Sequence, residues 1–340
     1  MITRAVWCGF MFLSFLIVAV MVEGCGNGCM TGRTGSSNKF ETVRARVQVW
    51  LSEASADGLL ISSACLKDTI VDDWDHQRDK YQIVSVRKPD DYNRAGHVPH
   101  ATDIYWVDIA NDSSLEQLDS NKTVILYCYF GHASMLSCTI LNLLGYRCRS
   151  LAFGMMGWNL DALVKEPWDQ KADYEVELAR DESKESYPLP VITSRQRDAR
   201  SILKEMARGY LSGEGSPVIP SSDVKGIVDA WGHKEVEYQI VDVRSKRDYE
   251  AGHVPHSINI PWAKVAEVRN LKKLDPNRTT IVYSENGQTG QLATTVLSLL
   301  GYRAVDMKFG MMDWNSRYID RTDMWRGAAG YPVEVSEESR

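Results

Sequence analysis

The feature that most constrains this chain is an internal repeat the size of a domain. The motif Ala-Gly-His-Val-Pro-His at residues 95–100 recurs at 251–256, and Gly-Tyr-Arg at 145–147 recurs at 301–303. Both pairs are 156 residues apart. A constant offset of this length far exceeds the unit of a solenoid, so the chain holds two copies of one whole domain.

Each copy alternates apolar strand patterns with helical patterns. In the first copy, the runs 81–84 and 124–127 are apolar and rich in β-branched residues, and a long helical pattern follows the second run. Strands that alternate with helices predict a parallel sheet that is covered on both faces. We therefore expect an α/β fold with two tandem domains, each a mainly parallel sheet with helices on both faces. A chain of 340 residues is long enough for two such cores.

The N-terminal residues have the pattern of an export signal. Arg4 supplies a positive charge, residues 6–21 are almost entirely apolar, and Gly24 precedes Cys25. This segment resembles the bacterial lipoprotein signal, which implies that Cys25 is lipidated. An ordinary cleaved signal and an uncleaved anchor remain alternatives. The pattern predicts an exported protein that is membrane-anchored in the bacterial cell envelope, on the periplasmic side.

These patterns divide the chain into four segments. The predicted segments are a signal peptide at 1–24, a flexible Gly- and Ser-rich tether at 25–42, a first domain at 43–192 with its core at about 76–165, and a second domain at 193–340 with its core at about 233–322.

Composition excludes several classes of function. The net charge of −6 and the absence of a long basic run argue against nucleic acid as a partner. None of the seven cysteines follows Cys148, and none shows paired CxxC spacing, so we expect neither a metal site nor a disulfide framework in the second half. No cofactor motif is present. Cys138 and Cys148 are expected to be buried apolar residues, and a redox switch is the alternative.

The strongest candidate for chemistry is Cys128, which ends the apolar run 124–127. A loop with Gly131 follows it and leads into a helical pattern. A thiol at that position faces the free N–H groups and the positive dipole end of a helix, which favour the thiolate. The carboxyl end of a strand is also where open α/β sheets bind ligands. We therefore predict that Cys128 is a nucleophile that carries a transferable group.

The ordered motifs resemble the rhodanese (thiosulfate sulfurtransferase) family over nearly all of residues 43–335. The resemblance rests on Val86-Arg87, Gly96-His97-Val98-Pro99, the Cys128 loop and Trp158, with second copies of most of them. It implies that Cys128 accepts sulfane sulfur from a small donor and passes the persulfide to cyanide or a thiol. The amides expected to cradle that sulfur belong to Tyr129, Phe130, Gly131, His132, Ala133 and Ser134.

Two positions depart from the family pattern. Many of its loops carry an arginine that binds an anionic donor, whereas this loop ends in Ala133 and Ser134, which puts thiosulfate as the donor in doubt. Ser85 stands where the second copy has Asp242, and we expect it to loosen a hydrogen bond at the end of a strand. His132 could face the entering anion, or it could be a solvent-facing residue without a role.

The second copy has Ser284 in place of the cysteine. Serine cannot carry a persulfide, and no histidine in that loop could activate the hydroxyl. Glu285 would add like charge beside an incoming anion. We therefore expect the second domain to be inactive, and to shape the cleft or recruit a protein partner.

Two other functions remain as alternatives. In one, both domains form a non-catalytic binding or sensing module of the cell envelope. In the other, the protein is a cysteine phosphatase or arsenate reductase, although such sites need an arginine that this loop lacks.

Overall fold

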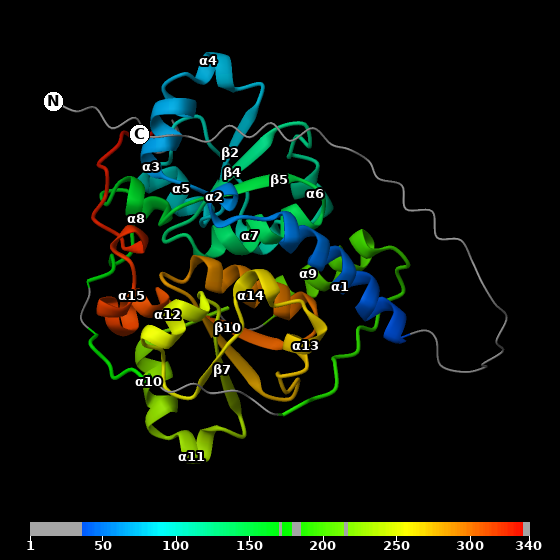
Figure 1. Cartoon of the computed structure of the whole chain (residues 1–340). Coiled ribbons are helices and arrows are strands. Elements are labelled where there is room, and N and C mark those ends of the chain that lie inside the picture. Colours follow the sequence, from blue (N-terminus) through cyan, green and yellow to red (C-terminus); the bar gives the residue numbers. More distant parts are fainter. Residues whose placement is uncertain (1–35, 170–171, 179–184, 214–216, 336–340) are drawn as a thin grey trace.

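The computed structural model describes residues 36–169, 172–178, 185–213 and 217–335. Within these ranges the chain forms two α/β units, one above the other in the view of Figure 1. The predicted signal peptide and Cys25 lie outside the described residues. No helix in the described ranges is long and apolar enough to span a bilayer.

The first unit contains five strands and a series of mostly short helices. Its helices are α1 (Ser36–Glu53), α2 (Ala56–Leu59), α3 (Ser63–Leu66), the π-helix η1 (Lys67–Val71), α4 (Trp74–Gln77), α5 (Pro89–Ala95), the 3-10 helix η2 (Trp106–Asp108), α6 (Asp112–Leu115), α7 (His132–Leu143) and α8 (Gly154–Trp158). Its strands are β1 (Leu60–Ile61), β2 (Tyr81–Ser85), β3 (Thr102–Asp103), β4 (Thr123–Tyr127) and β5 (Arg147–Leu151).

The second unit repeats this series. Its helices are α9 (Ala199–Leu211), α10 (Ser221–Asp229), α11 (Trp231–Lys234), α12 (Lys246–Ala251), η3 (Trp262–Lys264), α13 (Val268–Leu271), α14 (Gln288–Leu299), α15 (Gly310–Asn315), η4 (Ser316–Tyr318) and η5 (Arg321–Asp323). Its strands are β6 (Val218–Ile219), β7 (Tyr238–Asp242), β8 (Ser257–Asn259), β9 (Thr279–Tyr283) and β10 (Arg303–Met307).

Both sheets are parallel and have the same strand order. The orders are β1-β5-β4-β2-β3 and β6-β10-β9-β7-β8, and every neighbouring pair runs parallel. Four of the five residues in each of the central strands β4 and β9 are buried, because helices cover both faces of each sheet. The structure confirms the predicted α/β fold of two tandem units.

Helices α7 and α14 pack against each other between the two sheets (Figure 1). Each has ten of its 12 residues buried, including serines, threonines and Gln291. A helix exposes so little surface only when a sheet covers one side and another element covers the other. The two units therefore share one apolar core along this helix pair, which includes residues of both units.

Helix α1 begins earlier than the sequence analysis predicted. It starts at Ser36, so residues 36–42 of the predicted tether are helical. The reason is that Phe40 extends the apolar face of Val43, Val47 and Leu51, and all four side chains are buried. The rest of the predicted tether lies outside the described residues.

The two units exchange their C-terminal tails. The last described segment, drawn in red in Figure 1, leaves α15 and runs along the first unit. There the Trp158 indole N–H donates to the carbonyl of Pro332 (2.9 Å), and the backbones of His97 and Glu334 pair in both directions (2.8 and 2.9 Å). Tyr331 packs edge-on against Trp158.

The segment that follows the first unit makes the same contacts on the second. The Trp314 indole N–H donates to the carbonyl of Glu175 (2.9 Å), and the backbones of Glu177 and His253 pair (2.8 and 3.0 Å). The predicted division at residue 192 therefore separates each tail from the unit against which it packs.

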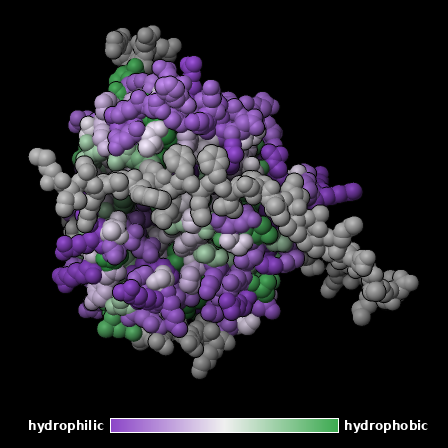
Figure 2. Space-filling view, turned by 45° about the horizontal axis from the view of Figure 1, so that its top comes forward, coloured by the Kyte–Doolittle hydropathy of each residue, from purple (hydrophilic) through white to green (hydrophobic). Residues whose placement is uncertain are grey.

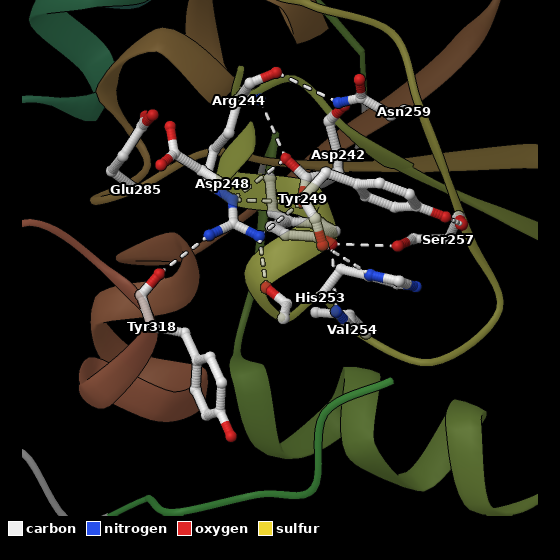
Figure 3. A network of polar contacts seen from close by, with 12 residues as sticks. Asp242, Arg244, Asp248, Tyr249, His253, Val254, Ser257, Asn259, Glu285 and Tyr318 are labelled. Atoms are coloured by element: carbon white, nitrogen blue, oxygen red, sulfur yellow. Dashed lines mark hydrogen bonds and ion pairs between the residues drawn. The ribbon is translucent and has the colours of Figure 1, made fainter. Parts of the chain in front are cut away.

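A buried arginine follows the second strand of each unit, and its hydrogen-bond partners differ between the two units. Arg244 binds both oxygens of Asp242 and donates to the carbonyls of Tyr318 and Gly252 (Figure 3). Arg87 donates to the corresponding carbonyls of Ala162 and Gly96, but Ser85 offers it no carboxylate. Ser85 thus removes a buried ion pair, which is a larger change than the loosened hydrogen bond that the sequence predicted.

The face of the molecule shown in Figure 2 is mostly hydrophilic. Purple side chains predominate among the coloured atoms of the face shown in Figure 2, and green ones form small groups. The large exposed apolar side chains are scattered along the described residues: Val49, Leu160, Val164, Leu178, Val191, Val236 and Val335. Isolated apolar residues of this kind are normal on a folded surface.

Candidate active site

Cys128 lies directly after β4, at the carboxyl edge of the first sheet. Its loop is short, because α7 begins at His132 with Gly131 as the N-cap, at φ 100°. The Gly131 N–H donates to Sγ of Cys128 (3.2 Å), and the Ser134 hydroxyl lies 3.5 Å from the same sulfur. One backbone amide of the predicted cradle therefore points at the thiol, with a hydroxyl beside it.

Helix α8 holds this loop from the other side. The amides of Met155 and Met156 donate to the carbonyls of Cys128 and Tyr129, both at 2.9 Å. A Cβ on Gly154 would lie 2.3 Å from the Cys128 carbonyl oxygen, so only glycine permits this approach. The carbonyls of the loop are therefore turned toward α8 and away from the sulfur.

Tyr129 and Phe130 extend outward from the loop. The Tyr129 hydroxyl donates to the carboxylate of Asp91, and the guanidinium of Arg87 lies 5.9 Å from the Tyr129 ring centroid. Burial raises the pKa of Tyr129, so this hydroxyl keeps its proton. Phe130 packs edge-on against Phe309 of the second unit.

His132 is not the solvent-facing residue that was one of the two alternatives. It is buried between the units, where its Nδ1 lies 2.9 Å from the carboxyl of Asp306 on β10. The Phe309 amide donates to its Nε2 (3.5 Å), which leaves the proton of a neutral imidazole on Nδ1. Burial lowers the pKa of His132 to about 3, so the imidazole is neutral at neutral pH, and burial also raises the pKa of Asp306 and so favours its protonated form.

A pseudo-twofold relation explains the position of His132. Its counterpart on α14 is Gln288, whose side-chain oxygen accepts the Phe153 amide (3.4 Å) just as His132 accepts that of Phe309. Each of these side chains packs against the loop glycine of the other unit. The first residue of each helix is therefore part of the contact between the units.

The serine loop of the second unit has the same backbone geometry. The Gly287 N–H donates to Oγ of Ser284 (3.0 Å), and the Met311 amide donates to the Ser284 carbonyl (2.9 Å). Burial raises the pKa of Glu285, the next residue, to about 7. The loop is thus a scaffold shared by both units, and the sulfur atom is what distinguishes the first.

A cavity of about 300 Å³ opens beside Cys128, and both units line it. The residues from the first unit are Trp106, Cys128, Tyr129, Phe130, His132 and Ala133, and those from the second are Pro217, Val218, Pro220 and Lys308. Cys128 is only 2% exposed, but its position in this wall gives a small reactant access to it.

Sequence reasoning missed Trp106 and the four residues from the second unit. A usable signal existed for Lys308 alone, because it replaces Ala152 of the first copy directly before the shared Phe-Gly-Met-Met motif. Nothing in the sequence indicated that the ends of β6 and β10 would face the loop after β4.

The other described cysteines lie away from the cavity. Cys65, Cys138 and Cys148 are free thiols, and the last two are buried. Burial raises the pKa of Cys138 to about 12 and also raises that of Cys148, so both remain thiols. Among the described residues, no three His, Cys, Asp or Glu side chains form a group that could hold a metal ion.

Comparison with curated proteins finds relatives that share part of this chain. An adenylyltransferase and sulfurtransferase uba4 of Ogataea parapolymorpha is 38% identical over 84 residues, which are 24% of this chain and 21% of that protein. Thiosulfate:glutathione sulfurtransferase of Saccharomyces cerevisiae is 31% identical over 114 residues, 30% of this chain and 80% of that protein. Thiosulfate sulfurtransferase PspE of Escherichia coli is 36% identical over 73 residues, 22% of this chain and 70% of that protein.

The chain therefore spans about a fifth of the uba4 protein and most of the other two. The rhodanese-like domain model matches residues 70–161 and 228–317, which together are more than half of the chain. These two stretches contain the corresponding Cys128 and Ser284 loops. The chain belongs to the rhodanese-like domain family, as a tandem of two such domains.

Proposed function

We propose that this protein is a sulfurtransferase that carries sulfane sulfur as a persulfide on Cys128. The observation that carries the proposal is the position of the Cys128 sulfur, in a cavity wall and under the amide of Gly131 at the start of α7. Relatives that are named sulfurtransferases support sulfur transfer as the general activity.

The geometry suits a two-step transfer. In the first step the Cys128 thiolate attacks the sulfane sulfur of the donor, a new S–S bond forms, and the donor residue leaves with the electron pair of the broken bond. In the second step a thiolate or cyanide attacks the outer sulfur, and Cys128 departs as thiolate. The Gly131 amide and the N-terminus of α7 stabilise the negative charge in each state.

The second domain carries no persulfide in this proposal. Ser284 has the same amide contact as Cys128, but a hydroxyl cannot accept sulfane sulfur. The acceptor is a thiophile such as cyanide or a thiol.

The test is the mass of the intact protein after incubation with thiosulfate. We expect the wild type to gain one sulfur atom that cyanide removes, and Cys128→Ser to gain none. Cys65→Ser, which removes a half-buried free thiol outside the cavity, is the matched control and should load normally. A wild type that gains no sulfur from thiosulfate or an organic persulfide, or a Cys128→Ser protein that does, would refute the proposal.

We further propose that the protein is exported and anchored through a lipid on Cys25. The support is the charged, apolar and small-residue pattern of residues 4–25. In a bacterial host, radiolabelled fatty acid should enter the wild type and not Cys25→Ser. Labelling of both proteins, or of neither, would contradict lipidation at this residue.

A further inference from the structure

Among the described residues, one charged side chain lies in the wall of the cavity beside Cys128. Of its lining residues, Lys308 is basic and His132 is held neutral by burial. The remainder are apolar or aromatic residues and Cys128 itself. An anion that enters this cavity therefore meets the ammonium group of Lys308, which comes from the second domain.

The Lys308 ammonium is not engaged in an ion pair or a hydrogen bond within the described residues. It lies over the rings of Phe130 and Phe309, 4.6 and 5.0 Å from their centroids. The nearby carboxylate of Asp313 already accepts hydrogen bonds from Trp168 (2.9 Å) and Ser221 (2.5 Å). The aromatic contacts hold the Lys308 chain in place and leave its N–H donors available.

Partial burial removes water from the Lys308 ammonium and so lowers the pKa of Lys308. Asp313 opposes this shift and Lys165 adds to it. A partly desolvated cation that forms no direct ion pair in the described residues gains from an anion that replaces its lost water. The position of Lys308 in the wall therefore favours a negatively charged ligand in the cavity.

The loop around Cys128 has no cation of its own. Ala133 stands near its end, and the Ser134 hydroxyl is bonded to the Gly131 carbonyl and lies 2.8 Å from the Ser150 hydroxyl. The counterpart of Lys308 in the first copy is Ala152, so the serine loop receives no matching charge. The cation thus comes from the domain without the cysteine and reaches the domain that has it.

We propose that Lys308 binds the anionic end of the sulfur donor while Cys128 attacks its sulfane sulfur. This inference rests on the proposed sulfurtransferase function. The donors it favours carry sulfane sulfur on a sulfonyl group, as thiosulfate and thiosulfonates do. The bond between the two donor sulfurs breaks, the sulfane sulfur remains on Cys128, and sulfite or a sulfinate leaves with the electron pair and its charge beside Lys308.

This assignment makes the second domain part of the active site. It also answers the doubt that the arginine-free loop raised about thiosulfate, because the missing positive charge is supplied across the cavity. Lys308 then governs which donors bind, and the nucleophilic step stays with Cys128.

The test uses the full-length protein and the variant Lys308→Met, which keeps an unbranched side chain over Phe130. We expect the KM for thiosulfate to rise about tenfold, the effect of losing one charge-assisted contact, with a smaller change in kcat. Lys308→Arg should retain most of the affinity. Lys246→Met removes an exposed ammonium of α12 that does not line the cavity, and its KM should stay close to that of the wild type.

A second measurement is independent of sulfur transfer. Cys128 is alkylated with iodoacetate, an anion, and with iodoacetamide, its neutral analogue; each forms one S–C bond and releases iodide. We expect Lys308→Met to lower the iodoacetate rate relative to the iodoacetamide rate, and circular dichroism verifies that the variant is folded. Lys308→Arg should keep the ratio of the wild type, and an unchanged ratio in Lys308→Met would overturn the inference.

The two failures are distinguishable. A wild type that prefers iodoacetate through Lys308 but never forms a persulfide would refute the sulfurtransferase function and leave anion binding by Lys308 intact. A wild type that forms the persulfide, with Lys308→Met unchanged in KM and in alkylation ratio, would refute the role of Lys308 alone.

Discussion

At the scale of single residues, His132 and Asp306 show how burial shifts the pKa values of two neighbouring groups in opposite directions. Asp306 is fully buried, one of its oxygens faces Nδ1 of His132, and the other has no hydrogen-bond partner in the described part of the chain. Burial lowers the pKa of His132 to about 3 and raises that of Asp306, and both shifts favour a neutral imidazole beside a protonated carboxyl. A neutral carboxyl is the form that a site without a cation can accommodate.

This pair should make the stability of the protein fall as the pH rises above 6.5. In the unfolded state, His132 and Asp306 together hold one titratable proton between about pH 4 and about pH 6.5. We expect the folded pair to hold one as well, so the pair adds no pH dependence to the free energy of unfolding in that range. Above 6.5 the unfolded pair holds none while Asp306 in the folded state keeps its proton. The free energy of unfolding then decreases by up to about 1.4 kcal/mol per pH unit.

Asp306→Asn removes this dependence, because its amide carries no titratable proton in either state. Urea unfolding of the wild type and Asp306→Asn at pH 6.5, 7.5 and 8.5 measures the difference. Asp320→Asn is the control, since the pKa of this exposed carboxyl is lowered and it is ionised throughout that range. Equal slopes for the wild type and Asp306→Asn would show that Asp306 is already ionised in the fold.

At the scale of elements, the two units carry a carboxyl group on different strands near their buried arginine. In the second unit, Asp242 on β7 binds Arg244, and Asn259 on β8 donates to backbone carbonyls (Figure 3). In the first unit, β2 has Ser85 at the matching position, and the carboxyl group belongs to Asp103 on β3. Burial raises the pKa of Asp103 to about 6. Nε of Arg87 is left without a partner among the described residues.

The double variant Ser85→Asp/Asp103→Asn should stabilise the first domain. It gives β2 and β3 the Asp and Asn side chains that β7 and β8 have at the matching positions. The Arg87 guanidinium then gains a carboxylate that it can bind through both oxygens. A satisfied buried charged group contributes about 1–3 kcal/mol, which urea unfolding at pH 7 should detect.

The single variants separate the causes of this gain. Ser85→Asp alone should gain less, because Asp103 remains as a neighbouring carboxyl, and Asp103→Asn alone should lose stability, because Arg87 then has no nearby carboxylate. A double variant no more stable than the wild type would show that the carbonyls of Gly96 and Ala162 already satisfy Arg87.

At the scale of the whole molecule, each domain depends on a tail from the other. Residues 329–334 bind the first domain around Trp158 and His97, and residues 174–177 bind the second around Trp314 and His253. With the helix pair α7 and α14, these tails join the two units on which the walls of the cavity lie.

A chain that stops after Arg326 should loosen the first domain and spare the second. It loses several hydrogen bonds to Gly157, Trp158 and His97, each worth about 1 kcal/mol net. Hydrogen exchange should therefore become faster in α8 and near His97. The matching amides near His253, which the tail at Glu177 still protects, are the internal control. Faster exchange in both domains alike, or in the second alone, would contradict the exchange of tails.

The sequence by itself determined the repeated α/β architecture and the place of Cys128. Both depend on patterns formed by residues close together in the sequence. These are the apolar strand runs, the glycine in the loop, and the helices that begin shortly after the strands end. A constant offset between the copies also identified Ser284 as the inactive counterpart. The start of α1 was missed only because the apolar spacing of Phe40 lies inside a Gly- and Ser-rich segment.

The tertiary structure alone decided what surrounds the sulfur. His132 faces Asp306, Lys308 faces the cavity, and the tails change partners because two copies of one fold pack about a pseudo-twofold relation through α7 and α14. Residues more than 170 positions apart meet there, and no local pattern records which positions will face one another. The sequence specifies the nucleophile, and the packing of the two domains specifies the charge and the walls that a substrate meets.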